Sequence, residues 1–211
     1  MAVITSIKQQ KKRDRVNVYL DGKFGFGIDL DNFVILNLRV GQDLSETEIE
    51  KIVKKADFQK VLEKLLNFMM VRLRSEKEIR DWLYRKKIPE VMHKDLFTKV
   101  KSFDLVDDIK FAKWWIESRQ LFRPKSKRVL VMELKLKGIS KDIISNVLDE
   151  TEIDERKVAL GFLEKRRAHW KGVQKEKMKQ KMIEYLVRKG FDFEIAKNVV
   201  KDYNNHEDDK I

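Results

Sequence analysis

Hydrophobic and other residues alternate along the amino-terminal part of the chain, a pattern typical of strands with one buried face. The dipeptide Asp21-Gly22 separates two of the alternating runs, which predicts a β-hairpin. A two-residue loop would pair Tyr19 with Phe24, whereas a three-residue loop would place all the alternating apolar residues on one face, and the sequence leaves both registers open. We expect a sheet of two or three strands, which is too small to stand alone and must pack on the helical segment after it. The alternating residues are Val3, Thr5, Ile7, Val16, Val18, Leu20, Phe24, Phe26 and Ile28.

Beyond residue 44 the apolar positions recur with the period of a helix. The first helical segment opens at Ser45, and Glu48 follows three residues later. This spacing predicts a capping box, in which each side chain satisfies a free backbone amide at the helix start. Almost every later segment has helical period as well, so the chain is predicted to be mainly α-helical.

One helical segment occurs three times. The stretch KSKRVLVMELKLKGI at 125–139 aligns with RSEKEIRDWLYRKKI at 74–88 and with KMKQKMIEYLVRKGF at 177–191. Apolar positions one helical turn apart coincide, and a basic residue follows in each stretch, so the period is about fifty residues. The aligned sets are Ser75, Ser126 and Met178; Ile79, Leu130 and Met182; Leu83, Leu134 and Leu186; Lys86, Lys137 and Lys189; and Ile88, Ile139 and Phe191.

The end of this repeated helix also recurs. Gly138 and Gly190 follow its last turn, where a residue in the left-handed conformation is favoured and glycine adopts it most readily. The first repeat departs from this pattern because Lys87 stands at the same place.

A further helix comes after each repeated segment. Ser140 and Asp192 precede it as candidate caps, and Pro89 holds the corresponding place in the first repeat, which suits an early helical position. Its apolar positions are four and five residues apart and form one stripe on the helix. The aligned sets are Met92, Ile143 and Ile195; Leu96, Val147 and Val199; and Phe97, Leu148 and Val200.

A preceding helix repeats most clearly in the last two repeats, as DDIKFAKWWIESR and DERKVALGFLEKR, and more loosely in the first, as FQKVLEKLLNFMMVR. The acidic pairs Asp107-Asp108 and Asp154-Glu155 begin this helix. They are interpreted as helix caps at the positive end of the dipole, rather than as metal ligands. The other aligned sets are Ala112 and Ala159; Trp115 and Phe162; Ile116 and Leu163; and Arg119 and Arg166.

The predicted fold is therefore mainly α, with three tandem three-helix repeats that form an elongated curved array after a small amino-terminal β-hairpin or sheet. A repeat of this size has too little core to be stable alone, and stacking buries its remaining apolar face. The predicted division is residues 1–44 for the β segment, 45–104 for a linking helix and the first repeat, 105–153 for the second repeat, 154–204 for the third, and 205–211 for a disordered tail.

The composition indicates the charge of a partner and excludes several kinds of reactive or metal-binding site. A formal net charge of +12 favours an anionic partner, most commonly nucleic acid. The absence of cysteine excludes disulfides and thiolate sites, and the three histidines show no metal-ligand spacing. No phosphate-binding loop, dinucleotide fingerprint or zinc-protease motif is present, so we expect no enzyme activity, no cofactor and no metal. Without a signal peptide or a membrane span, we expect a cytoplasmic protein.

Tryptophans and cations are the residues that could bind nucleic acid. Trp115 aligns with a core position, whereas Trp114 and Trp170 could either pack in the core or stack on bases. The run RRAHWKGVQKEKMKQK is either a solvated helix face or a phosphate-contacting surface. The candidate contact residues, chosen by charge and repeat position, are Arg72, Arg74, Lys86, Arg119, Arg123, Lys125, Lys127, Arg128, Lys137, Arg166, Arg167, Lys171 and Lys175.

The stretches RLRSEKEIRDWLYRKKI, DDIKFAKWWIESR, KRVLVMELKLKGI and YLVRKGF resemble, in this order, the motifs of the RecX family, the bacterial regulators of the RecA recombinase. The resemblance runs from the hairpin DGKFGFGI to about Tyr203, with Lys87 and the acidic tail NNHEDDKI as departures. It implies a fold of three tandem three-helix units.

The resemblance also implies a function. Members of the family bind the helical groove of the RecA filament on single-stranded DNA and inhibit its ATPase, strand-exchange and coprotease activities, which belong to DNA repair and the SOS response. The implied partners are the RecA filament and single-stranded DNA, contacted directly or through RecA, by a monomeric regulator. Two other hypotheses remain: a helical-repeat protein that binds nucleic acid without RecA, and a nuclease with carboxylates clustered from different repeats.

Overall fold

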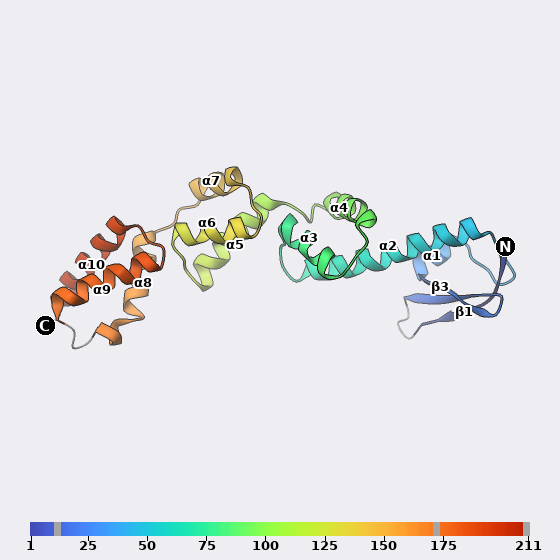
Figure 1. The fold of residues 1–211 in the computed structure, drawn as a ribbon, viewed down its shortest axis with the longest axis horizontal. Coiled ribbons are helices and arrows are strands. Elements are labelled where there is room, and N and C mark those ends of the chain that lie inside the picture. The colour runs from blue at the N-terminus through green and yellow to red at the C-terminus, as the bar shows by residue number, and fades with distance from the viewer. Residues whose placement is uncertain (11–13, 171–173, 209–211) are drawn as a thin grey trace. The chain divides into compact units, whose positions relative to one another are not determined.

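The structure is a computed structural model that describes residues 1–10, 14–170 and 174–208. Contacts between Cα atoms divide the chain into two compact units. Figure 1 shows the helices and strands, coloured by residue number along the chain. The first unit contains Met1–Arg72 and Leu83–Leu105, and the second contains Leu73–Trp82 and Val106–Ile211. The expected curved array concerns the arrangement of these units and stays a prediction, as does the five-part division of the chain.

The amino-terminal sheet has four antiparallel strands, which corrects the expectation of two or three. The fourth strand is only two residues long and pairs with Ala2 and Val3, so it is too short to produce a visible alternation in the sequence. The strands are β1 (Ala2–Gln9), β2 (Arg15–Leu20), β3 (Lys23–Asp29) and β4 (Asp43–Leu44), in the order β3-β2-β1-β4.

The hairpin between β2 and β3 has a two-residue loop. Asp21 and Gly22 adopt φ angles of 47° and 78°, and Tyr19 pairs with Phe24. Two positive φ angles match the twist of the flanking strands, and this is why Asp-Gly favours such a loop.

A β-bulge in β3 restores the alternation that the two-residue loop would otherwise shift. The register changes between Val18 and Tyr19, so Val18 faces Phe26 and Gly25 is the extra residue. Phe26 is consequently buried, whereas Phe24 is 61% exposed. A Cβ atom at Gly25 would lie 2.7 Å from the Leu20 side chain, so the bulge requires glycine there.

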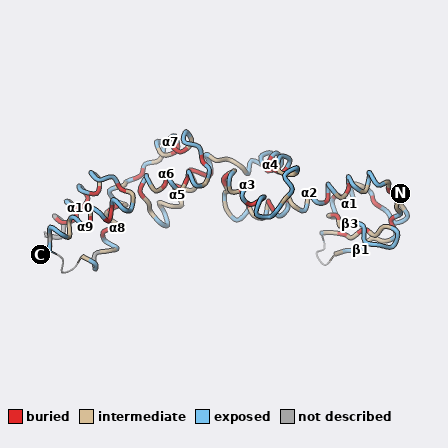
Figure 2. The backbone as a smooth tube through the Cα atoms, in the orientation of Figure 1, coloured by how far each residue is buried: buried red, intermediate tan, exposed pale blue. Residues whose placement is uncertain are grey.

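One face of the sheet packs on helix α2 (Glu46–Met70), and α1 (Leu30–Ile35) contacts strands β2 and β3. The predicted capping box is present, because Ser45 Oγ accepts from the Glu48 amide and Glu48 Oε2 accepts from the Ser45 amide. Figure 2 marks the buried backbone of this core. The core residues are Ile4, Val16, Val18, Phe26, Ile28, Leu38, Leu44, Ile52 and Ala56.

Helix α3 (Glu76–Arg85) contains the boundary between the two units. The later part of the first repeat, η1 (Glu90–Met92) and α4 (His93–Ser102), belongs to the first unit. Leu96 and Phe97 of the predicted stripe are buried there, whereas Met92 is partly buried. Val100, which the stripe did not include, is buried as well.

The second unit contains the second and third repeats, each with its own apolar core. Leu130 and Leu134 lie fully buried in the second repeat, and Met182 and Leu186 hold the same places in the third. The helices are α5 (Asp108–Phe122), α6 (Lys127–Leu136), α7 (Lys141–Glu150), α8 (Glu155–Glu164), η2 (Arg167–Trp170), α9 (Lys175–Arg188) and α10 (Phe193–Asp208).

The middle helix of each repeat ends in the same way. Gly138 and Gly190 have φ angles of 83° and 89°, and Lys87 adopts 53° at the same place, so the departure in sequence keeps the conformation. Just beyond the end of the helix, the amide of Ile139 returns to the Leu134 carbonyl, and its counterparts in the other repeats do likewise. The predicted mainly α fold with three-helix repeats is confirmed, with ten α-helices in the described residues. None of these helices is long and apolar enough to cross a bilayer.

Candidate functional site

The acidic pair that opens α5 caps two different helices. Asp107 Oδ1 accepts from the amides of Ile109 and Lys110, at 2.8 and 3.0 Å, so it caps its own helix. Asp108 Oδ1 accepts from the Glu76 amide at 2.9 Å, so it caps α3 of the preceding repeat. Both carboxylates therefore satisfy helix-start amides, and the capping interpretation is confirmed.

The corresponding pair at the start of α8, Asp154 and Glu155, also caps two different helices. Asp154 Oδ1 accepts from the Lys157 amide of its own helix at 2.9 Å. Glu155 Oε1 accepts from the Lys127 amide at the start of α6, also at 2.9 Å. Among the described residues, no three acidic or histidine side chains gather into a group that could hold a metal.

Two buried serines complete the connection between neighbouring repeats. Ser75 Oγ donates to the Lys137 carbonyl at 2.7 Å, and Ser126 Oγ donates to the Lys189 carbonyl at 3.1 Å. Neither serine has any exposed surface. Helix α3 therefore begins against the end of α6, and α6 begins against the end of α9. We call the contact at Ser75 the first joint and the contact at Ser126 the second joint.

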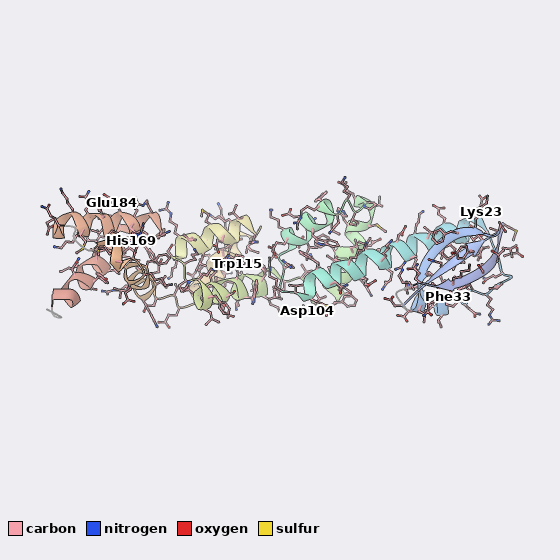
Figure 3. The ribbon with its side chains drawn as sticks, turned by 90° about the horizontal axis from the view of Figure 1, so that it is seen from below. Lys23, Phe33, Asp104, Trp115, His169 and Glu184 are labelled. Carbon is pink, nitrogen blue, oxygen red and sulfur yellow. The ribbon has the colours of Figure 1, made fainter. Side chains whose placement is uncertain are left out.

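Trp115, labelled in Figure 3, has two of the candidate cations close to its ring. Its indole N–H donates to Glu133 Oε2 at 2.8 Å, and Arg119 Nε donates to the same oxygen at 2.7 Å. The Arg119 guanidinium and the Lys137 ammonium lie 4.3 and 4.8 Å from the ring centre, and Lys137 also pairs with Glu78 at 2.5 Å. Arg119 and Lys137 thus already have charged and aromatic partners within the protein.

The third repeat has a similar stack on another ring. Arg166 and Lys189 lie 4.7 and 5.5 Å from the centre of the Tyr185 ring. Trp170 contacts the same ring at 6.1 Å, and Trp114 packs 5.8 Å from Phe111 in the second repeat. Trp114, Trp115 and Trp170 are all partly buried among these contacts.

Four candidate cations lie where α5 joins α6, and none of them has a side-chain partner among the described residues. We call Arg123, Lys125, Lys127 and Arg128 the α5–α6 cationic cluster. Their side chains form no hydrogen bond or ion pair within the described parts of the chain. Lys125 is partly buried and the other three are exposed, so this cluster is available to an anionic partner.

Two members of the cluster contradict the usual charge preference of a helix start. Lys127 and Arg128 occupy the first turn of α6, which contains no acidic residue. Cations near the positive end of a helix dipole each cost about 0.3–1 kcal/mol. Glu155 of the next repeat partly offsets this cost through the Lys127 amide. Cations placed at the start of a helix against this charge preference are expected where the surface serves binding rather than stability.

A cleft of about 230 Å³ adjoins the cluster, between the end of α5 and helix α8. Arg123, Lys125 and Lys165 line it together with Phe122 and Phe162. Phe122 continues the apolar spacing of α5, yet its side chain is 75% exposed, and it is not among the residues selected from the sequence. The signal for its exposure is Pro124, which ends the helix before that turn can pack. Lys165, which also lines the cleft, is likewise not among the candidate residues selected from the sequence.

The remaining candidates are distributed over both units. Arg72 and Arg74 have interactions within the protein, and Lys86 is exposed near the end of α3. Lys171 lies outside the described residues, and only the backbone is described for Arg167 and Lys175. The structure therefore brings together Arg123, Lys125, Lys127 and Arg128, and assigns structural partners to Arg119, Lys137 and Arg166.

Unpaired cations beside an exposed aromatic ring can bind phosphates and stack on bases. The three-helix repeats place the chain among helical-repeat proteins. The α5–α6 cationic cluster suits the binding of an anionic partner.

Comparison with known proteins identifies the family. A Regulatory protein RecX from Bacillus licheniformis is 33% identical over 99% of this chain and 80% of its own length. One from Listeria monocytogenes is 34% identical over 92% of this chain and 73% of its length. The chain therefore belongs to the RecX family. Matching domain descriptions are the Regulatory protein RecX N-terminal domain at 2–45, the second three-helix domain at 107–148 and the third at 154–200.

Solved structures agree on the fold. The crystal structure of a regulatory protein RecX has a TM-score of 0.73 at 24% identity and covers 96% of this chain and all of its own. RecX from Lactobacillus salivarius gives 0.62 at 23% identity, over 70% of this chain and 97% of its own.

Proposed function

We propose that this protein regulates the RecA recombinase by binding the helical groove of the RecA filament on single-stranded DNA. In doing so it mostly inhibits the ATPase, strand-exchange and coprotease activities of RecA, without catalysis of its own. Membership of a family of regulatory proteins supports the role. The observation that carries the binding mode is the α5–α6 cationic cluster, whose side chains have no partner among the described residues.

Inhibition results from contacts made to several protomers at once. Each repeat carries cations, and binding one protomer makes the next contact effectively intramolecular, which raises the apparent affinity. A ligand that prefers one filament geometry shifts the filament towards it, by no more than its differential affinity. The regulator braces neighbouring protomers and obstructs the rearrangement that accompanies ATP turnover. A monomeric, cytoplasmic protein suits this role.

Charge reversal within the cluster tests the proposal. We expect Lys127→Glu with Arg128→Glu to weaken co-sedimentation with RecA filaments at least tenfold and to relieve inhibition of the RecA ATPase. Stability should not fall, because the acidic side chains suit the helix start. The matched control is Lys181→Glu with Lys201→Glu, two exposed lysines of the third repeat without side-chain partners in the described ranges. Unchanged ATPase turnover at saturating wild-type protein would reject the proposed function.

Direct binding of single-stranded DNA without RecA is a second candidate. Phe122, 75% exposed beside Arg123 and Lys125, favours it, because a base stacked on an aromatic ring contributes about 1–3 kcal/mol. We expect Phe122→Ala to weaken binding to an oligo-dT strand about tenfold or more at constant salt. Arg123→Glu should additionally flatten the dependence of affinity on salt concentration. Oligo-dT binding that neither variant changes would exclude the cleft.

A further inference from the structure

A second surface of the middle repeat lies between helices α6 and α7, as a groove of about 350 Å³. Its lining includes three aliphatic side chains: Val131 and Leu148 are partly exposed, whereas Ile144 is almost completely buried. The groove therefore has an apolar floor that a partner side chain can reach. Its volume accommodates a few side chains of a partner segment.

Lysines border this floor on both helices. Lys127 and Lys135 come from α6 and Lys141 from α7, and all three are exposed. Their ammonium groups form no ion pair within the described ranges of the chain. One carboxylate, Asp149, also lines the groove, which leaves a local excess of positive charge.

The neighbouring row on α6 extends the apolar surface. Met132 and Leu136 lie one residue further along than the groove row, and they are 57% and 70% exposed. Exposed apolar side chains at these places occur only in the middle repeat. The counterparts are charged in both other repeats: Asp81 and Arg85 in the first, and Glu184 and Arg188 in the third.

We propose that this groove of the second repeat binds an acidic amphipathic helix of a partner protein. Apolar side chains of the helix enter between Val131 and Leu148, and its flanking carboxylates meet Lys135 and Lys141. A protein segment fits better than nucleic acid, because the lining contains no aromatic ring for a base to stack on. A phosphate backbone would gain nothing from the aliphatic floor. This inference does not rest on the proposed action on RecA, and its test contains neither RecA nor any RecA filament.

The test uses the full chain labelled with ¹⁵N and a synthetic peptide of about five helical turns (~18 residues). The peptide has leucines at positions i, i+3, i+4 and i+7 and glutamates beside them, and a scrambled peptide has the same composition. We expect the amphipathic peptide to shift the amide signals of Val131, Ser145 and Leu148. Lys135→Glu with Lys141→Glu should weaken its binding at least tenfold.

Lys181→Glu with Lys201→Glu provides the matched control, because it changes the net charge equally and lies outside the groove. It should bind the peptide like the wild type. Three results would overturn the inference: no shift in the groove, equal affinity for the scrambled peptide, or tighter binding of oligo-dT than of the peptide at the same amides.

Discussion

The first and second joints connect successive repeats through the same backbone groups. In each, a buried serine donates its hydroxyl proton to the carbonyl of a lysine at the end of the next middle helix, Lys137 or Lys189. In each, an acidic residue of the following repeat accepts from the first helical amide, at 2.9 Å in both cases. Serine oxygen also accepts from the amide three residues on, which is an ordinary helix cap.

The two joints differ in the side chains that surround this common core. Glu78 pairs with Lys137 across the first joint, and these side chains are only 14% and 27% exposed. Val129 stands in place of Glu78 in the second joint, and Lys189 forms no ion pair with any residue that the structure describes. The first joint therefore contains a partly buried ion pair, whereas the second contains an aliphatic contact.

The difference shows which interactions define the repeat. Backbone amides and carbonyls at helix ends must be satisfied wherever they are buried, so the groups that satisfy them recur. The surrounding side chains contribute stability in either form, charged or apolar, and are free to diverge. In the third repeat, Met178 takes the place of the joint serine.

The glycines at the joints should show the largest mutational effects. A Cβ atom at Gly138 would lie 2.5 Å from Lys77 Cβ, and one at Gly190 would lie 2.7 Å from Ser126 Oγ. Alanine also resists their positive φ angles. We expect Gly138→Ala and Gly190→Ala each to cost about 3 kcal/mol of local stability, measured by native-state hydrogen exchange across the joint.

Lys87 supplies the matched control for these glycines. It adopts the same left-handed conformation but is exposed. Lys87→Ala should change stability by less than about 0.5 kcal/mol. If Gly138→Ala and Lys87→Ala proved equally mild, close packing at the joints would not be what requires glycine.

Substitution of the joint serines, Ser75 and Ser126, should have the next largest effect on stability. Ser75→Ala and Ser126→Ala each leave a lysine carbonyl and a helix-start amide without their partner, at sites with no exposed surface. Such losses cost about 1–3 kcal/mol. Ser140 caps α7 from an exposed position, so Ser140→Ala should cost about 1 kcal/mol. Amide exchange rates at the starts of α3, α6 and α7 separate the three cases. Equal effects at all three serines would mean that the bonds between repeats add nothing.

Much of this architecture could be predicted from the sequence, because helical periodicity reports which residues share a buried face. Leu130 and Leu134 were aligned with positions in the other repeats, and both are buried. Helix ends could also be predicted, because they depend on residues close together in the sequence. Gly138 adopts the left-handed conformation just after α6, and Ser140 caps the start of α7.

Interactions between distant segments were not predictable in this way. The sequence indicated that Asp108 and Glu155 cap helices, but not that each caps the preceding repeat, because no local spacing encodes such a contact. Likewise, Arg119 and Lys137 resemble the cations of the cluster in sequence, and only the structure shows that they stack on Trp115 and pair with Glu133 and Glu78. Charge patterns therefore located the candidate surface but could not separate its free cations from its paired ones.

The ion pair of the first joint should have a smaller effect than the serines. A double-mutant cycle with Glu78→Ala and Lys137→Ala is expected to give a coupling energy of about 1 kcal/mol, between the values for exposed and buried pairs. The same cycle at Val129 and Lys189 should give a coupling energy near zero, because the Val129 side chain carries no charge. Hydrogen exchange at the start of α3 and of α6 measures both cycles. Comparable coupling in the two joints would remove the distinction between them.

Added salt should produce the smallest effect and should act on one joint alone. Raising ionic strength shortens the Debye length from about 10 Å at 0.1 M to about 3 Å at 1 M. The Glu78–Lys137 pair is partly shielded from solvent, so we expect the first joint to lose only a few tenths of a kcal/mol. The aliphatic contact at Val129 carries no charge and should not weaken with NaCl. Exchange rates of the Glu78 and Val129 amides, followed over this range in the same sample, give the comparison directly. The first joint should open more readily with salt while the second does not, and parallel changes at both amides would show that the ion pair does not distinguish them.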